Sequence, residues 1–184
     1  MNPILIFVII IAVIAIWAVT TYNGFIKARN SVEEGYSTMD VYLKKRFDLI
    51  PNLVETVKGY AKHEKETLEN LTAARAKVSS AGSVEERAQA ENQLTGALKT
   101  LFAVAEAYPD LKANTNFLNL QNQLQQVEQD IANARKYYNA VVKKYNNKCE
   151  MFPSSIIAGI FHFTRKPMFE VGSEAERENV QVQF

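Results

Sequence analysis

The fold is decided by the stretch FLNLQNQLQQVEQDIANARKYYNAVVKKY, residues 117–145. Apolar side chains recur in it at alternating spacings of three and four residues, the period of a helix that buries one face against other helices. These positions are Phe117, Leu120, Leu124, Val127, Ile131, Ala134, Tyr138, Val141 and Tyr145. Polar and charged residues fill most positions between them. The stretch therefore predicts a long amphipathic helix with a coiled-coil-type seam.

Less regular stretches of the same period predict two helices near the start of the chain. The first is expected to run from residue 22 to 50, with Pro51 ending it because proline cannot donate the next helical hydrogen bond. Asn52 is a cap-like residue with an acidic residue three positions later. A second helix is therefore expected over residues 53–79.

A third helix is predicted after the turn at residues 79–83. Ser83 and Glu86 have the spacing of a capping box at its start, and the Pro-containing loop 108–110 stops it. Four helices with short connections and one apolar face each predict an all-α fold. We expect an antiparallel up-down-up-down four-helix bundle over residues 23–150.

The N-terminus carries an uncharged block. Pro3 to Tyr22 is twenty residues without a charged side chain. As a helix it would be about 30 Å long, the thickness of a hydrocarbon core. A secretory signal peptide is the alternative, but that class begins with positively charged residues, and none precedes this block. Residues 1–22 are therefore predicted to be a retained transmembrane anchor that continues into the first bundle helix.

Basic residues next to the anchor predict its orientation. Lys27 and Arg29 follow the apolar block, whereas no lysine or arginine precedes it. Lysine and arginine are enriched on the cytoplasmic side of membrane proteins. The chain is thus expected to be single-pass, with its N-terminus outside and its bundle in the cytoplasm.

A second uncharged stretch, residues 151–163, follows the last bundle helix. It is too short to span a bilayer, but if each of the four helices reverses the direction of the one before it, the fourth ends on the membrane side and brings this stretch back there. If Pro51 only kinked one continuous helix, we would expect this geometry to fail. Packing on the bundle's own core is the alternative to contact with the membrane or another subunit. The candidate contact residues are Ile156, Ile157, Ile160, Phe161 and Phe163.

The C-terminal part is expected to divide into an apolar segment, residues 151–170, which packs on the bundle or at the membrane interface, and a mobile tail, residues 171–184. At the opposite end, Asp48, Pro51 and Asn52 form a candidate distal corner. Its residue types suit a helix stop and cap, and binding at this corner is the alternative.

Charged residues on or beside the apolar stripes indicate a buried ion pair that sets helix register. Arg46 with Glu64 and Arg75 with Glu33 are two pairings compatible with the pattern. The sequence does not choose between them.

Catalytic patterns are incomplete in this sequence. His63-Glu64 lacks the second histidine of a zinc-protease helix, because position 67 is Thr67. No Glu-x-x-His supports a di-metal carboxylate bundle. Cys149 has no histidine near it in sequence, and we expect an inert thiol. The sequence predicts no enzyme, no metal and no cofactor.

Several blocks make the chain similar to the LemA family of bacterial membrane proteins. The most specific is DVYLKKRFDLIPNLVETVKGYAKHE, residues 40–64, followed by YPDLK at 108–112 and Tyr-Asn pairs at 138–139 and 145–146. The resemblance implies one N-terminal transmembrane helix in the bacterial inner membrane, a short exterior N-terminus and a cytoplasmic helical bundle. It implies no reaction, although genes of the family are often found near those of membrane metalloproteases.

These observations predict a non-enzymatic, membrane-anchored helical bundle that acts as a scaffold, adaptor or self-assembling membrane component. The expected partners are the lipid bilayer and further copies of the chain, since anchoring raises their effective concentration. The alternative is a sensor or accessory subunit of another membrane protein, a transporter or a membrane metalloprotease. Nucleic acid is not expected, because 21 basic residues face 20 acidic ones.

Overall fold

The computed structural model describes residues 2–61 and 63–170, and this part of the chain is helical with no strand. The predicted tail at 171–184 lies outside the described residues. In chain order the helices are α1 (Pro3–Tyr60), α2 (Lys65–Ser80), α3 (Val84–Ala105), the single turn α4 (Pro109–Lys112), α5 (Thr115–Glu150) and α6 (Ser154–Ile160).

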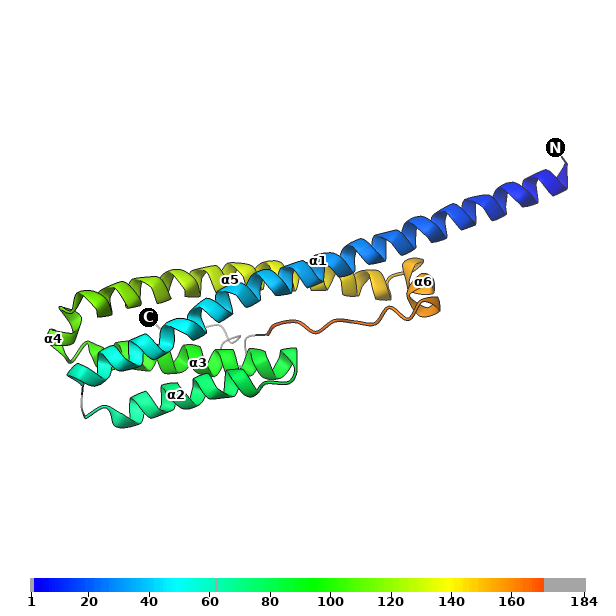
Figure 1. Ribbon diagram of the computed structural model, residues 1–184. Helices are drawn as coiled ribbons and strands as arrows, with labels where there is room; N and C mark the ends of the chain where they lie inside the picture. Colours follow the sequence, from blue (N-terminus) through cyan, green and yellow to red (C-terminus); the bar gives the residue numbers. More distant parts are fainter. Residues whose placement is uncertain (1, 62, 171–184) are drawn as a thin grey trace, which may run out of the picture.

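Helix α1 runs without interruption from the N-terminal block to the far end of the bundle (Figure 1). The prediction that Pro51 ends the first helix is therefore wrong, as is a second helix over 53–79. Leu53 and Val57, which follow the proline, are buried in the core, and their packing keeps this last part helical. The chain reverses instead between the end of α1 at Tyr60 and the start of α2 at Lys65, so the number of reversals is unchanged.

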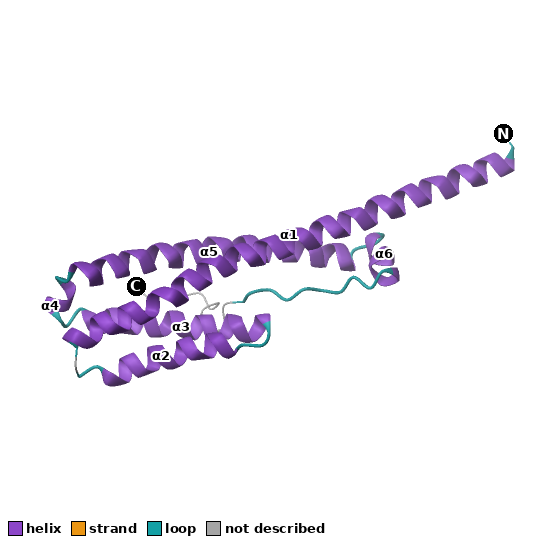
Figure 2. Ribbon diagram, viewed as in Figure 1, coloured by secondary structure: helices purple, strands orange, loops and turns teal. Residues whose placement is uncertain are grey.

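The helices alternate in direction, as the sequence predicts. Helix α1 packs along α5, and α2 packs on α3 as a hairpin that covers only the distal half of the long pair (Figure 2). The end of α5 returns to the part of α1 that follows the apolar block, where α6 also lies. The expectation that a continuous first helix would send residues 151–163 elsewhere is thus wrong.

The predicted seam of α5 faces the core. Seven of its nine positions are buried, Leu120 and Val141 are partly buried, and Val142 is fully buried beside them. The predicted capping box is confirmed as well, because the hydroxyl oxygen of Ser83 accepts a hydrogen bond from the amide of Glu86 at 3.1 Å. The Glu86 carboxylate in turn accepts one from the amide of Gly82, the residue before the cap, and not from Ser83 as in a regular capping box.

One helix in the described part of the chain, α1, contains a stretch long and apolar enough to cross a membrane. None of the residues of that apolar window is buried by the rest of the molecule. Trp17 and Ala18 are the first side chains that pack on the bundle. The apolar stretch therefore projects from the bundle as a bare helix (Figure 1).

Candidate functional site

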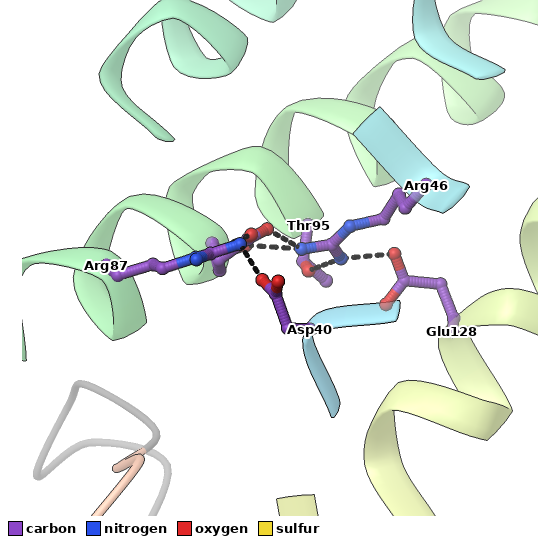
Figure 3. Close-up of polar contacts among 6 residues, drawn as sticks. Asp40, Arg46, Arg87, Thr95 and Glu128 are labelled. Carbon is purple, nitrogen blue, oxygen red and sulfur yellow. Dashed lines mark hydrogen bonds and ion pairs between the residues drawn. The ribbon is translucent and has the colours of Figure 1, made fainter. Parts of the chain in front are cut away.

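A buried arginine joins three helices of the bundle. Arg46 of α1 is 1% exposed, and its guanidinium pairs with the carboxylates of Glu91 on α3 and Glu128 on α5. It also donates to the hydroxyl of Thr95 at 2.6 Å and to the backbone carbonyl of Glu91 (Figure 3). A planar guanidinium suits this task, because its donors can reach several acceptors at fixed angles.

A second arginine extends the cluster toward solvent. Arg87 of α3 pairs with Asp40 of α1, and its Nε lies 3.9 Å from a carboxylate oxygen of Glu91. Arg46 and Arg87 thus approach different oxygens of the Glu91 carboxylate, Oε2 and Oε1 respectively. The cluster therefore ties the α2–α3 hairpin to α1 and α5 by charge.

Burial dominates the electrostatics of Glu91. Loss of water raises the pKa of this carboxyl above its usual 4.5, although attraction to Arg46 and Arg87 acts in the opposite direction. The charged form of Glu91 therefore depends on its arginine partners. A carboxylate held in this way specifies how α3 sits against α1, which agrees with a role in helix register.

The predicted pairings of these charges were wrong in their partners. Arg46 pairs with Glu91 and Glu128, not with Glu64, which accepts a hydrogen bond from the hydroxyl of Tyr108 at 2.7 Å. The partners of Arg46 were not predicted because they depend on how α3 and α5 are rotated about their axes, which the sequence pattern does not determine.

The other guessed pair, Arg75 with Glu33, does not form either. The Glu33 carboxylate lies 3.9 Å from Arg29, one turn away on α1. Arg75 lies on α2 and contacts Phe47 of α1 instead.

The cluster lies beside a groove between α3 and α5. A cavity of about 560 Å³ is lined by Arg46, Glu91 and Glu128 together with Gly96 and Arg135. A second cavity, of about 460 Å³, shares part of this lining and adds apolar side chains from both helices, among them Leu98, Phe102 and Leu124. The two cavities form one groove, which we call the α3–α5 groove.

The predicted distal corner is not a single site. Asp48 is exposed and pairs with Lys44, one turn away on α1, at 2.7 Å. Asn52 does not cap a helix, and only its backbone carbonyl is engaged, by the hydroxyl of Thr56 at 2.8 Å. Pro51 is exposed within α1. No contact that the described residues make brings these three side chains together around a ligand.

The helix around Pro51 is stabilised by a contact that the sequence did not predict. Because proline has no N–H, the carbonyl of Phe47, four residues earlier, loses its helical donor. The Nε of Arg75 on α2 donates to that carbonyl at 3.1 Å, and the guanidinium lies 3.7 Å from the centroid of the Phe47 ring. Arg75 thus replaces the hydrogen bond that Pro51 removes.

We expect Arg75→Met to lower the free energy of unfolding by about 1–3 kcal/mol, because it leaves the Phe47 carbonyl without a donor. In a Pro51→Ala background the same substitution should cost less, since the amide of Ala at position 51 can bond that carbonyl. Chemical denaturation of the four full-length variants in detergent, followed by circular dichroism, measures the difference. Equal costs in both backgrounds would contradict the assignment, and Asn70→Met at an exposed position of α2 is the control.

Two asparagines of α5 hold the segment that follows α6. The side-chain amide of Asn139 exchanges two hydrogen bonds with the backbone of Phe169, at 3.0 and 2.8 Å. Asn146 does the same with the backbone of Lys166, at 2.9 and 2.8 Å. The Tyr-Asn pairs seven residues apart were the signal for this clamp, and the sequence analysis noted them without a role.

The predicted contact residues of the second apolar stretch lie together at the end of the bundle from which the apolar part of α1 projects. Ile157 is buried and Phe163 is half-buried, whereas Ile156, Ile160 and Phe161 are exposed. They lie on or directly after α6.

Ring contacts fix this stretch against α1. The ring of Phe163 stacks on that of Phe25 with centroids 4.6 Å apart, and the ring of Phe161 lies 4.7 Å from that of Tyr22. His162 allows this by adopting a left-handed φ of 55° at the end of α6, which lets the amide of Phe163 donate to the carbonyl of Ala158.

The residues considered as candidates for catalysis or metal binding lie far apart from one another. His63 is exposed in the turn after α1, and Cys149 is partly buried near the end of α5. Burial raises the pKa of the Cys149 thiol, and this outweighs the hydrogen bond with Tyr145, which acts in the opposite direction. Within the described ranges, no three His, Cys, Asp or Glu side chains gather closely enough to hold a metal ion.

Comparison with known proteins gives the family. The model of the LemA family matches residues 35–184, most of the chain. The chain belongs to the LemA family. Protein LemA of Metamycoplasma hominis is 27% identical over 182 residues, which cover 96% of this chain and 81% of that protein.

Two further relatives of this LemA protein are named magnetosome proteins MamQ 1 and MamQ 2, both of Paramagnetospirillum magneticum. Each is 24% identical over 175 residues, 81% of this chain. The chain spans only 64% of the length of these two relatives. Together with the apolar part of α1, the relatives indicate a membrane-associated helical protein.

Proposed function

We propose that this LemA protein is a non-enzymatic membrane scaffold that uses the α3–α5 groove as its contact surface. The groove is the observation that carries the proposal. In the described chain α1 packs on α5 and α2 on α3, but α3 and α5 have no comparable backbone packing between them. The two cavities lie between these helices, with charged side chains lining one and more apolar side chains lining the other.

Such a surface suits a helix of another protein or of a second copy. Amphipathic helices bind in grooves that offer an apolar floor, and charges at the edge select the partner. Anchoring by α1 would hold copies in one plane and raise their effective concentration.

The proposal can be tested by a substitution that places a bulky side chain in the α3–α5 groove. Gly96 faces open space, since a Cβ built there meets no atom within 4 Å, and it lines the larger cavity. Gly96→Trp should abolish the assembly, measured as the mass and composition of particles extracted from native membranes into nanodiscs. Gly59→Trp is a matched control on α1, because a Cβ at Gly59 also meets open space and lines neither cavity of the groove.

Unchanged particles for Gly96→Trp would contradict the groove as contact surface. The composition of the wild-type particles separates two roles. Particles made of this chain support a self-assembling scaffold, whereas one dominant other protein supports an accessory or sensor subunit. The unbroken course of α1 from the apolar stretch to the distal end favours this second role, because movement of one end is passed to the other.

The topology belongs to the same proposal. We place the N-terminus outside and the bundle in the cytoplasm of a bacterial cell, on the strength of Lys27 and Arg29 beside the anchor. A reporter fused after Phe184 that is active only outside the cytoplasm would contradict this orientation.

A further inference from the structure

Residues 151–163 present a bare apolar surface at the membrane end of the bundle. Phe152 is 80% exposed, Met151 and Ile160 are 62% exposed, and Phe161 and Ile156 are about half exposed. We call these five side chains the membrane-end face. Behind them, Ile157 and Ala158 are buried against the bundle. The stretch therefore has two apolar sides, only one of which the protein itself covers.

The position of this face along the axis of α1 determines whether it lies in water, at the lipid headgroups or among the acyl chains. Trp17 and Ala18 pack on the same core cluster as Ile157 and Ala158. Trp17 lies about 7 Å before Tyr22 along the helix axis. If the hydrocarbon core takes up about 30 Å of helix from Pro3 onward, the face lies at the boundary between acyl chains and headgroups.

The face is also continuous with the surface that lipid would cover. Tyr22, at the end of the uncharged block, touches Phe161, and the apolar window of α1 is unburied. A contiguous apolar patch of large side chains is costly in water and is common where a protein enters a membrane.

The charged residues near the membrane-end face are mostly basic, which suits a surface of anionic lipids. The last turns of α5 carry the exposed Lys143 and Lys144 and the half-buried Lys148, against one acidic residue, Glu150, which pairs with Arg165 at 2.7 Å. The Lys148 ammonium lies 5.1 Å from the centroid of the Phe25 ring, at the level of the membrane exit. Cations next to an apolar face favour contact with anionic headgroups.

We propose that the membrane-end face is a second membrane anchor, which inserts into the interface of the leaflet on the bundle's side. This goes beyond the scaffold role and does not depend on it, because the α3–α5 groove uses other residues. Two attachments, the span and the face, would fix how the bundle stands on the bilayer.

Depth-dependent fluorescence quenching tests the anchor with the full-length chain. The single tryptophan is first replaced, Trp17→Phe, and a reporter is then introduced as Phe152→Trp or, separately, Ile160→Trp. The protein is reconstituted into vesicles of phosphatidylcholine and phosphatidylglycerol, with bromine atoms on the acyl chains at shallow or deep positions. We expect blue-shifted emission from both reporters and a loss of intensity with the shallow bromines.

A matched control comes from the same molecule. Val41 is 66% exposed on α1 and lies far from the membrane exit, so Val41→Trp should show water-exposed emission and no quenching by bromine. Emission at positions 152 and 160 equal to that at position 41 would overturn the proposal. Blue-shifted emission without bromine quenching would also overturn it, because a protein surface would then cover the face. Circular dichroism of each variant confirms that the bundle is intact.

Discussion

Arg46→Met is expected to lower the free energy of unfolding by about 3–5 kcal/mol, because it leaves the carboxylate of Glu91 buried without its main partner. For a chain of this size the loss corresponds to a fall in Tm of roughly 6–20 °C. Thermal unfolding of the full-length protein in detergent, followed by circular dichroism, measures it. Adding Glu91→Gln should recover much of the loss, since the uncompensated charge is then absent.

The pH dependence of this loss identifies its cause. The pKa of Glu91 is raised in the folded protein, so the unfolded chain ionises this residue first. The contribution of Glu91 to stability is therefore fully present below its usual pKa of 4.5. It declines as the pH rises through the pKa that Glu91 has in the folded protein. In Arg46→Met the decline should be larger and extend to higher pH, and in the double variant the part due to Glu91 should be absent. A loss that does not vary with pH would show that packing, not charge, is responsible.

Phe25→Ala is expected to detach α6 from the membrane end of the bundle and to cost about 3–5 kcal/mol of local stability, as for other buried phenylalanines. Phe25 is fully buried, stacks on Phe163 and meets the edge of the Tyr145 ring. Hydrogen exchange of the backbone amides in residues 154–163 measures the detachment as a loss of protection.

The matched control is Phe117→Ala, which removes an equally buried ring at the distal end of α5. It should destabilise the distal core and leave protection of residues 154–163 unchanged. If Phe25→Ala and Phe117→Ala reduce that protection equally, the ring stack is not what holds α6.

Periodicity predicted the helices well, and Pro51 shows where such reasoning fails. A proline removes one hydrogen bond, but whether a helix ends there depends on tertiary contacts. Here Leu53 and Val57 pack in the core, and Arg75 supplies the missing donor from another helix. Those contacts join residues far apart in the chain, so no local pattern could reveal them.

The candidate site divides in the same way. The burial of Arg46 could be predicted from its place on the apolar stripe of α1, but its partners Glu91 and Glu128 could not. They depend on the rotation of α3 and α5 about their axes. The α3–α5 groove is a still more global property, since it arises because the hairpin packs on one side of the long helices. Residues 151–163 lie beside the part of α1 that follows the apolar block, and this position follows from the alternating direction of the helices.

The unbroken helix α1 also acts mechanically as a lever. Beyond Tyr22 it extends about 57 Å to its end at Tyr60, so a tilt of about 10° in the bilayer would carry the distal end roughly 10 Å sideways. Helices tilt by such amounts when membrane thickness changes. If the span were the sole attachment, the position of the bundle's far end would follow the thickness of the bilayer, and insertion of the membrane-end face would oppose that movement.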